Sequence, residues 1–234
     1  MYFPWIGMFE QIKLCDVFIF YDDVAYSKGS FVNRVQIKTD TGEGFTWLTV
    51  PLKKVKIGDK INAVEIDYTK SWQNTHLMLL KQHYKKSAYF KEMMEVIESL
   101  FSKNYKNIGE LSAASMELII DYYNLNENKS FYTSSKLLIE GKSTQRVFDL
   151  VNFFKGSTYI TGHGAKNYLD HELFEKSGIN IEYMDYMKKP YLQQSLPFNP
   201  YVSILDLIAN CGKEGKKELI SKTKNWRNFI NESA

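Results

Sequence analysis

Two carboxylates and an Asn-Arg pair near the amino terminus are the residues best suited to chemistry. Asp22 and Asp23 directly follow the apolar run 17–21, and Asn33 and Arg34 lie shortly after them. A continuous apolar run predicts a buried strand, and ligands of α/β sheets collect at the carboxyl ends of such strands. Arginine suits bidentate binding of phosphate or carboxylate. Neighbouring strand residues face opposite ways, so one aspartate can serve a site while the other pairs with the arginine. A salt-bridged strand end without a ligand is the alternative.

Two histidines on one predicted helix face provide a candidate general base. His76 and His83 are seven residues apart, whereas helical metal pairs are three or four apart, so no metal site is predicted. Histidine titrates near neutrality, whereas an aspartate needs burial to do so. We therefore rank His76 before Asp22 and Asp23 as the base. An interior, hydrogen-bonded His76 is the alternative.

A glycine-rich turn is the second candidate for anion binding. Residues 161–164, Thr-Gly-His-Gly, follow a predicted strand and enter a helix. Glycine allows close approach, and a helix amino terminus presents free N–H groups to an anion. A tight turn without a ligand is the alternative. Residues 140–144 are not a phosphate loop, because Lys136 stands where glycine is required and 137–139 is apolar.

Composition and cysteine usage exclude several classes of protein. The formal net charge of +3 is too small to indicate nucleic-acid binding. Cys15 and Cys211 give neither a disulfide framework nor zinc spacing, and both fall in apolar helices, where thiols are inert. No Ser/His/Asp or Cys/His pattern is present, and no cofactor is identified. No signal peptide is evident, and no apolar run approaches the roughly 20 residues of a membrane span. We expect a cytoplasmic protein.

The elements that must position these residues change in character along the chain. Apolar spacing predicts a helix at 6–14. Segments rich in Val, Ile, Thr and aromatic residues predict strands at 17–21, 33–38, 45–50 and 61–66. Helical spacing then dominates from about 70 to 125. Beyond it we expect a helix at 144–154, a strand at 157–161, a helix from 165, a strand at 179–183 and a helical tail at 203–229.

This alternation predicts an α/β fold. Parallel strands need helical crossovers, so we expect a mainly parallel, Rossmann-like sheet with helices on its faces and a helical insertion. Residues 1–69 would form an N-terminal α/β part, 70–125 the insertion, and 126–234 the C-terminal α/β part of a single domain.

Several motifs in the same order resemble the WbqC-like family, found among bacterial surface-polysaccharide genes. They are residues 2–9, 18–23, 33–34, 47–51, 72–76, 134–135, Gly162, Ala165, Lys166, Tyr168, Tyr191, Gln193, Phe198, 203–206 and Asn210. Two departures stand out. Family members carry a strand and Gln-Pro before the aromatic-proline motif, so we expect a start at an internal Met or a shortened chain. They also carry Pro-Ser where this chain has His163-Gly164, so a catalytic His163 would not be a family property.

The resemblance implies an enzyme that transfers an acyl or aminoacyl group to the amine of a nucleotide-linked sugar in O-antigen or other surface-polysaccharide biosynthesis. Its partners would be the nucleotide sugar and the acyl donor. The matched motifs imply catalytic roles for His76, Asp22 and Asp23. They imply substrate binding by Asn33, Arg34, Ser134, Ser135, Gly162, Lys166, Tyr168, Tyr191, Gln193 and Asp206. We expect eight side chains to converge in one cleft, namely Asp22, Asp23, Asn33, Arg34, His76, Lys166, Tyr168 and Gln193.

Two alternatives stay open. One is a non-catalytic nucleotide-sugar-binding or assembly protein. The other is an adenylate-forming, nucleotidylyltransferase-like enzyme, although the loop at 4–7 lacks the histidines that hold triphosphate in those enzymes.

Overall fold

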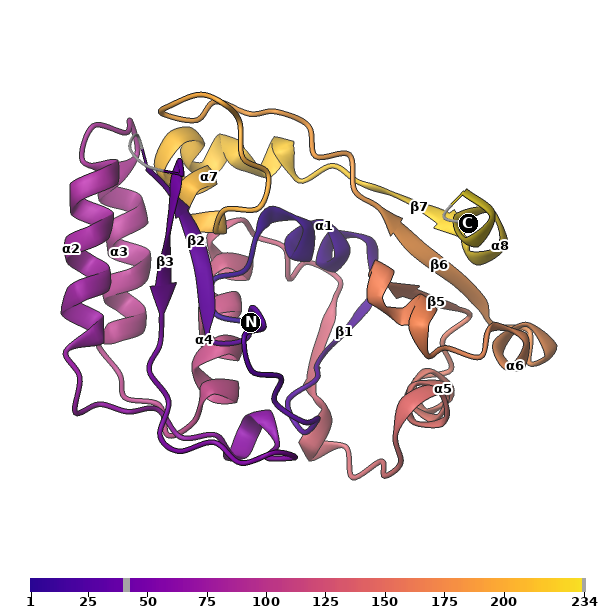
Figure 1. Ribbon diagram of the computed structural model, residues 1–234. Helices are drawn as coiled ribbons and strands as arrows, with labels where there is room; N and C mark the ends of the chain where they lie inside the picture. Colours follow the sequence, from indigo (N-terminus) through magenta and orange to yellow (C-terminus); the bar gives the residue numbers. More distant parts are fainter. Residues whose placement is uncertain (40–42, 233–234) are drawn as a thin grey trace. The chain divides into compact units, whose positions relative to one another are not determined.

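The computed structural model describes residues 1–39 and 43–232 (Figure 1). The described chain forms two compact units, each built from separate segments. Unit 1 comprises residues 1–9, 21–127 and 188–219. Unit 2 comprises residues 10–20, 128–187 and the chain from Ile220 on.

Unit 1 combines an antiparallel strand pair with helices. β2 (Arg34–Lys38) pairs with β3 (Phe45–Thr49), and Arg34 lies opposite Thr49. The helices are α2 (Trp72–Tyr84), α3 (Phe90–Phe101), α4 (Ile108–Tyr122) and α7 (Ile204–Cys211). They occupy most of the span predicted to be helical and the start of the predicted helical tail. Figure 1 shows α2 and α3 side by side next to the β2–β3 pair.

Local sequence explains where these helices form. In α3 the buried side chains are Met93, Met94, Ile97 and Leu100, which recur at the spacing of one helix face. α4 begins at a capping pair, because the Asn107 side chain accepts a hydrogen bond from the Glu110 N–H at 2.9 Å and donates to the Glu110 carboxylate at 2.9 Å.

Unit 2 holds two small sheets. β1 (Val17–Phe20) pairs in parallel with β4 (Ser130–Thr133). β5 (Thr158–Thr161) pairs in parallel with β6 (Asn180–Asp185), which pairs antiparallel with β7 (Lys222–Asn225). The helices are the second half of α1 (Ile6–Leu14), α5 (Ser143–Phe153), α6 (His171–Lys176) and α8 (Trp226–Glu232).

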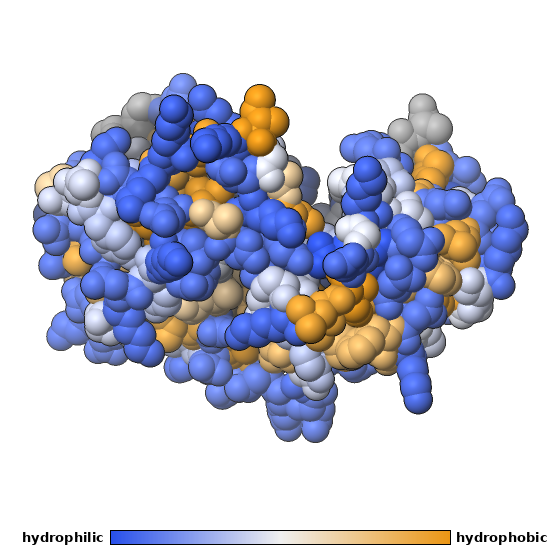
Figure 2. Space-filling view, turned by 90° about the horizontal axis from the view of Figure 1, so that it is seen from below, coloured by the Kyte–Doolittle hydropathy of each residue, from blue (hydrophilic) through white to orange (hydrophobic). Residues whose placement is uncertain are grey.

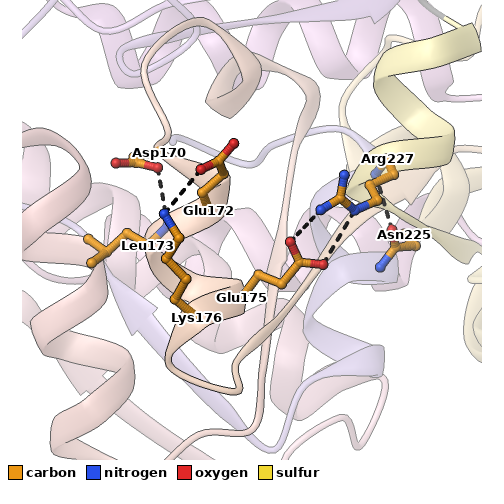
Figure 3. Close-up of polar contacts among 7 residues, drawn as sticks. All are labelled: Asp170, Glu172, Leu173, Glu175, Lys176, Asn225 and Arg227. Carbon is orange, nitrogen blue, oxygen red and sulfur yellow. Dashed lines mark hydrogen bonds and ion pairs between the residues drawn. The ribbon is translucent and has the colours of Figure 1, made fainter.

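Aliphatic and aromatic side chains together form the core of unit 2. Tyr183 on β6 stacks on Phe229 of α8, with ring centroids 4.2 Å apart and planes 6° apart. Ion pairs flank this core. Figure 3 shows Arg227 of α8 directed at Glu175 of α6, with one nitrogen–oxygen distance of 3.3 Å, and Asp170 capping α6. Such exposed pairs contribute little stability, so the hydrophobic core carries most of it.

The fold is mixed α/β, as predicted, but the single large parallel sheet is not found among residues 1–39 and 43–232. The strands form three small sheets, and the parallel pairs are β1–β4 and β5–β6. β2 and β3 are adjacent in sequence and pair antiparallel, which needs no crossover helix. Alternation of strands and helices therefore did not determine how the strands associate.

Three predicted elements differ from the structure. In place of the helix expected from 165, His163–Asn167 form a 3-10 helix and α6 begins only at His171. Segment 61–66 is a 3-10 helix (Ile61–Ala63) followed by isolated bridges, because the N–H groups of Ile61 and Asn62 donate to loop carbonyls of Val24 and Asp22. The tail predicted to be helical contains β7, which pairs with β6 through residues Lys-Thr-Lys-Asn. That run has no apolar alternation to indicate a strand.

Hydrophilic residues predominate on the face shown in Figure 2, where hydrophobic residues gather in small patches. Within residues 1–39 and 43–232, none of the helices combines the length and apolarity required to cross a bilayer.

Candidate functional site

The candidate site in unit 1 is built on the β2–β3 pair. Arg34 begins β2, and its guanidinium carbon lies 4.4 Å from the centroid of the Trp47 ring on β3. Arg34 pairs with Thr49 and Trp47 with Gln36, so Arg34 and Trp47 are diagonal neighbours on one face. Phe31, which is 49% exposed, extends this aromatic face with its ring 5.7 Å from Trp47.

The loop before β2 holds the arginine in place. An Arg34 Nη2 donates to the carbonyl of Gly29, whose φ of +79° favours glycine. Asn33 donates to the Val50 carbonyl at 2.8 Å and accepts from the Tyr26 hydroxyl at 2.8 Å. Burial raises the pKa of Tyr26, and the charge of Arg34 partly offsets this. These hydrogen bonds orient both Asn33 and Arg34 at the start of β2.

One donor of the guanidinium is unused. Arg34 Nε is buried and has no hydrogen-bond partner. Guanidinium groups bind carboxylate and phosphate through two parallel N–H donors. The stacked guanidinium thus retains a donor with the chemistry to bind an anion, and its role in a site stays a prediction.

Asp22 and Asp23 lie half-buried in the loop that leads toward Tyr26. The Asp22 carboxylate accepts a hydrogen bond from the Asn62 side chain at 3.3 Å, and the Asp22 carbonyl accepts from the Asn62 N–H at 2.9 Å. Asp22 therefore fixes the loop against the 3-10 helix. Both aspartates belong to unit 1, as does Arg34.

His76 lies in the interior of unit 1. It is 2% exposed, and its ring nitrogens contact the Tyr2 hydroxyl at 3.1 Å and the Thr49 carbonyl at 3.2 Å. Burial lowers its pKa to about 4. His76 thus joins the aromatic-proline segment to the β3 residue that faces Arg34. Its predicted role as a base stays a prediction, and its geometry favours a positioning role.

A second polar cluster surrounds Asp206. This residue is 0% exposed, and its two carboxylate oxygens accept hydrogen bonds from Tyr84 at 2.9 Å and Tyr191 at 2.8 Å. Gln193 donates to the Tyr191 hydroxyl at 3.1 Å. Burial raises the pKa of Asp206 to about 6, while these donors and the charge of Lys38 oppose the increase. Asp206, Tyr191 and Gln193 therefore converge, as a buried network.

The motif around Asp206 also anchors the aromatic-proline segment. The Ser203 hydroxyl donates to the Phe3 carbonyl at 2.8 Å and accepts from the Leu205 N–H at 3.2 Å. The Ile204 N–H donates to the Pro4 carbonyl at 2.9 Å. The Ser203 side chain thus caps α7 and also binds the aromatic-proline segment at Phe3.

The remaining predicted residues belong to unit 2. Ser134 is buried and Ser135 half-buried in the turn after β4. Gly162 follows β5 and precedes the 3-10 helix His163–Asn167, in which Lys166 is exposed, and the exposed Tyr168 comes directly after that helix. That all predicted residues share one cleft stays a prediction.

Sequence reasoning left out the residues that complete both clusters. Trp47 falls within a recognised motif, yet nothing local shows that it faces Arg34. Tyr84 meets Asp206 across 122 positions of sequence, which no short motif can reveal. For the part of the chain described here, no group of three or more His, Cys, Asp and Glu side chains could hold a metal ion.

Comparisons with known proteins agree with the motifs. The model of the WbqC-like protein family matches residues 1–218. A Mycobacterium tuberculosis protein, "Uncharacterized protein Rv1507c", is 32% identical over 216 residues, covering 91% of each chain. No solved structure matches the chain.

Proposed function

Because this chain belongs to the WbqC-like protein family, we propose that it is a transferase of surface-polysaccharide biosynthesis. It would transfer an acyl or aminoacyl group to the amine of a nucleotide-linked amino sugar, as in O-antigen synthesis. The observation that carries the proposal is Arg34, which is stacked on Trp47 and retains an unpartnered Nε.

Arg34 would bind the diphosphate of the nucleotide sugar. Its charge and its spare donor fit a phosphate oxygen, and Gly29 fixes the guanidinium plane. Trp47 and the exposed Phe31 offer an aromatic surface for the flat face of a sugar or nucleobase. These features support binding of the nucleotide sugar by unit 1.

The transfer requires a base for the attacking amine. The nitrogen attacks the donor carbonyl, an N–C bond forms, the donor's leaving group departs with the electron pair, and the amine proton passes to the base. Among the predicted bases, Asp22 and Asp23 are half-buried in the chain segment between β1 and β2, whereas His76 is enclosed and already bonded at both nitrogens. We therefore place Asp22 and Asp23 before His76 as candidates.

The proposal is tested by product analysis. Purified protein is incubated with uridine- and thymidine-diphosphate amino sugars and a panel of acyl donors, and the products are weighed by mass spectrometry. We expect one acylated sugar, lost in Arg34→Ala and kept in Arg227→Ala, an exposed arginine of unit 2. A deletion strain should produce glycan that lacks one acyl group. Unchanged glycan would overturn the proposal.

A binding protein without turnover is the second candidate. The engagement of both His76 nitrogens favours it, because that histidine then offers no free base. Such a protein would bind the nucleotide sugar in calorimetry, depend on Arg34, and release it unchanged with every donor in the panel.

A further inference from the structure

We infer that the carboxyl edge of the β5–β6 strand pair is a binding site for the amine of a small polar ligand, with Glu10 as its acceptor. The ligand class is an amino sugar or a similar hydroxylated amine. The inference extends the proposed function in its choice of ligand, but it concerns residues of unit 2 and does not require Arg34.

The strand register creates the edge. β5 and β6 are parallel, with Thr161 opposite Tyr183, so both strands end on the same side. Gly162 follows one strand, and Tyr186 follows the other. A Cβ on Gly162 would lie 3.3 Å from the Tyr186 hydroxyl, so a side chain there would crowd it. Ligands of α/β folds collect at such edges.

α1 brings Glu10 to this edge. The next residue of the helix, Gln11, donates to the carbonyl of Ile160 on β5 at 3.0 Å. Glu10 hydrogen-bonds to Ser221 and interacts electrostatically with Tyr186. Four parts of unit 2 thus contribute to the edge. Glu10 comes from α1, Gly162 from the turn after β5, Tyr186 from the segment after β6 and Ser221 from the segment before β7.

One oxygen of the Glu10 carboxyl group lacks a donor. Glu10 is 4% exposed, and its Oε2 has no partner. The Ser221 hydroxyl has one hydrogen, and it already donates to the Asp185 carbonyl at 2.8 Å. An ionised Glu10 would therefore compete for that hydrogen. An unpartnered buried acceptor is costly, which points to a ligand that supplies the missing donors.

Charge selects the ligand. Asp185 is a second acid near the edge, and Lys224 pairs with Asp185 at 3.7 Å and with Glu232 at 2.6 Å. Burial raises the pKa of Glu10 to about 7, as expected for a carboxyl group without a nearby cation. An ammonium group would supply both the donors and the positive charge. The glycine-rich turn at 162–164 therefore serves a cationic ligand better than the anion predicted from its glycines.

The test uses NMR of protein labelled with 13C at glutamate carboxyls. Glucosamine is the probe, and glucose is the neutral control. The Glu10 resonance is assigned by its loss in Glu10→Gln. We expect glucosamine to shift this resonance saturably and glucose to leave it unmoved. Glu10→Gln should weaken glucosamine binding at least tenfold, as followed on the Tyr186 ring, and Glu140→Gln should not change it, because Glu140 is an exposed acid of the same unit.

Three results would overturn the inference. They are an unmoved Glu10 resonance, equal shifts with glucosamine and glucose, and glucosamine binding by Glu10→Gln within twofold of wild type. If that variant does not fold, the wild-type titration decides alone. A parallel titration with uridine diphosphate, which has no amine, reports on Arg34, so failure of this site and failure of the proposed function are distinguished.

Discussion

Two groups of side chains in unit 1 differ in how completely their hydrogen bonds are satisfied. The Asp206 cluster consists of Tyr84, Tyr191, Gln193 and Asp206, and the Arg34 cluster consists of Phe31, Arg34 and Trp47. Each carboxylate oxygen of Asp206 accepts a hydrogen bond from a tyrosine hydroxyl, and Asp206 is fully buried. Arg34 is half-buried and leaves its Nε without a partner. A satisfied network stabilises the fold, whereas a guanidinium with one unused donor keeps the means to bind a ligand, as we propose for Arg34.

The same contrast separates His76 from Glu10. Both ring nitrogens of His76 are bonded, whereas Glu10 Oε2 is not. The Trp72 Nε1 and the Tyr123 hydroxyl also lack partners, but these groups are uncharged and cost less to bury. We therefore expect Asp206 and His76 to act on stability, Arg34 on binding, and Glu10 on both.

The largest expected effect is on the Asp206 network. Asp206→Asn replaces an acceptor oxygen with an NH2 group that faces a tyrosine hydroxyl, and so leaves buried polar groups unpaired. We expect a loss of about 3 kcal/mol in the free energy of unfolding, measured by urea denaturation. Asp121→Asn, at an exposed position of unit 1, should change it by less than about 0.5 kcal/mol. Equal effects of the two substitutions would show that the network is not structural.

His76 should make the protein less stable in acid. Its pKa is lowered to about 4 from an ordinary value of 6.5, so between these values the unfolded chain binds more protons than the folded one. The free energy of unfolding should therefore fall by up to about 3 kcal/mol as the pH drops from 6.5 through 4.

The matched variants are His76→Gln and His83→Gln. Denaturation at pH 7 and pH 4.5 should show that the first removes much of the acid sensitivity and the second does not. If both keep the wild-type dependence, His76 is not the buried neutral group described here.

Glu10 should make the protein less stable at high pH, whereas His76 makes it less stable at low pH. Its pKa is raised to about 7 from 4.5, so the folded chain binds more protons between these values, and stability should fall as the pH rises through them. Glu10→Gln cannot ionise, and at pH 8 it should be more stable than wild type by about 2 kcal/mol. Thermal denaturation at pH 5 and pH 8 measures this. An equal or lower stability of the variant at pH 8 would contradict the account.

Trp47 should give the smallest effect, on affinity rather than stability. Trp47→Leu removes the stacking surface but keeps the charge of Arg34, so binding of a nucleotide-diphosphate sugar should weaken about fivefold, or about 1 kcal/mol. The salt dependence of binding should persist, because it reports on the arginine–phosphate contact. Calorimetry at two salt concentrations checks this. Loss of the salt dependence would place the phosphate elsewhere.

Elements that depend on local periodicity or composition were predicted from the sequence. Elements and contacts that depend on residues far apart in the sequence were not. The helix at Phe90–Phe101 follows from its apolar spacing, and β2 and β3 follow from their composition. β7 forms only because β6 offers a pairing edge. Residue type singled out Arg34, but whether its Nε or Glu10 Oε2 has a partner depends on the packed side chains around each. The order of the motifs likewise grouped Asp206 with Arg34 as binding residues, although the surroundings of Asp206 suit a structural role and those of Arg34 suit ligand binding.

The central claim is tested most directly by one calorimetric titration of a nucleotide-diphosphate sugar into Arg34→Lys and Asp206→Asn, at a temperature where both variants are folded. Lysine keeps the charge but loses the planar, bidentate donors. The account predicts at least tenfold weaker binding by Arg34→Lys with unchanged unfolding free energy, and binding within threefold of wild type by the less stable Asp206→Asn. Wild-type affinity in Arg34→Lys, or lost binding in a folded Asp206→Asn, would contradict it.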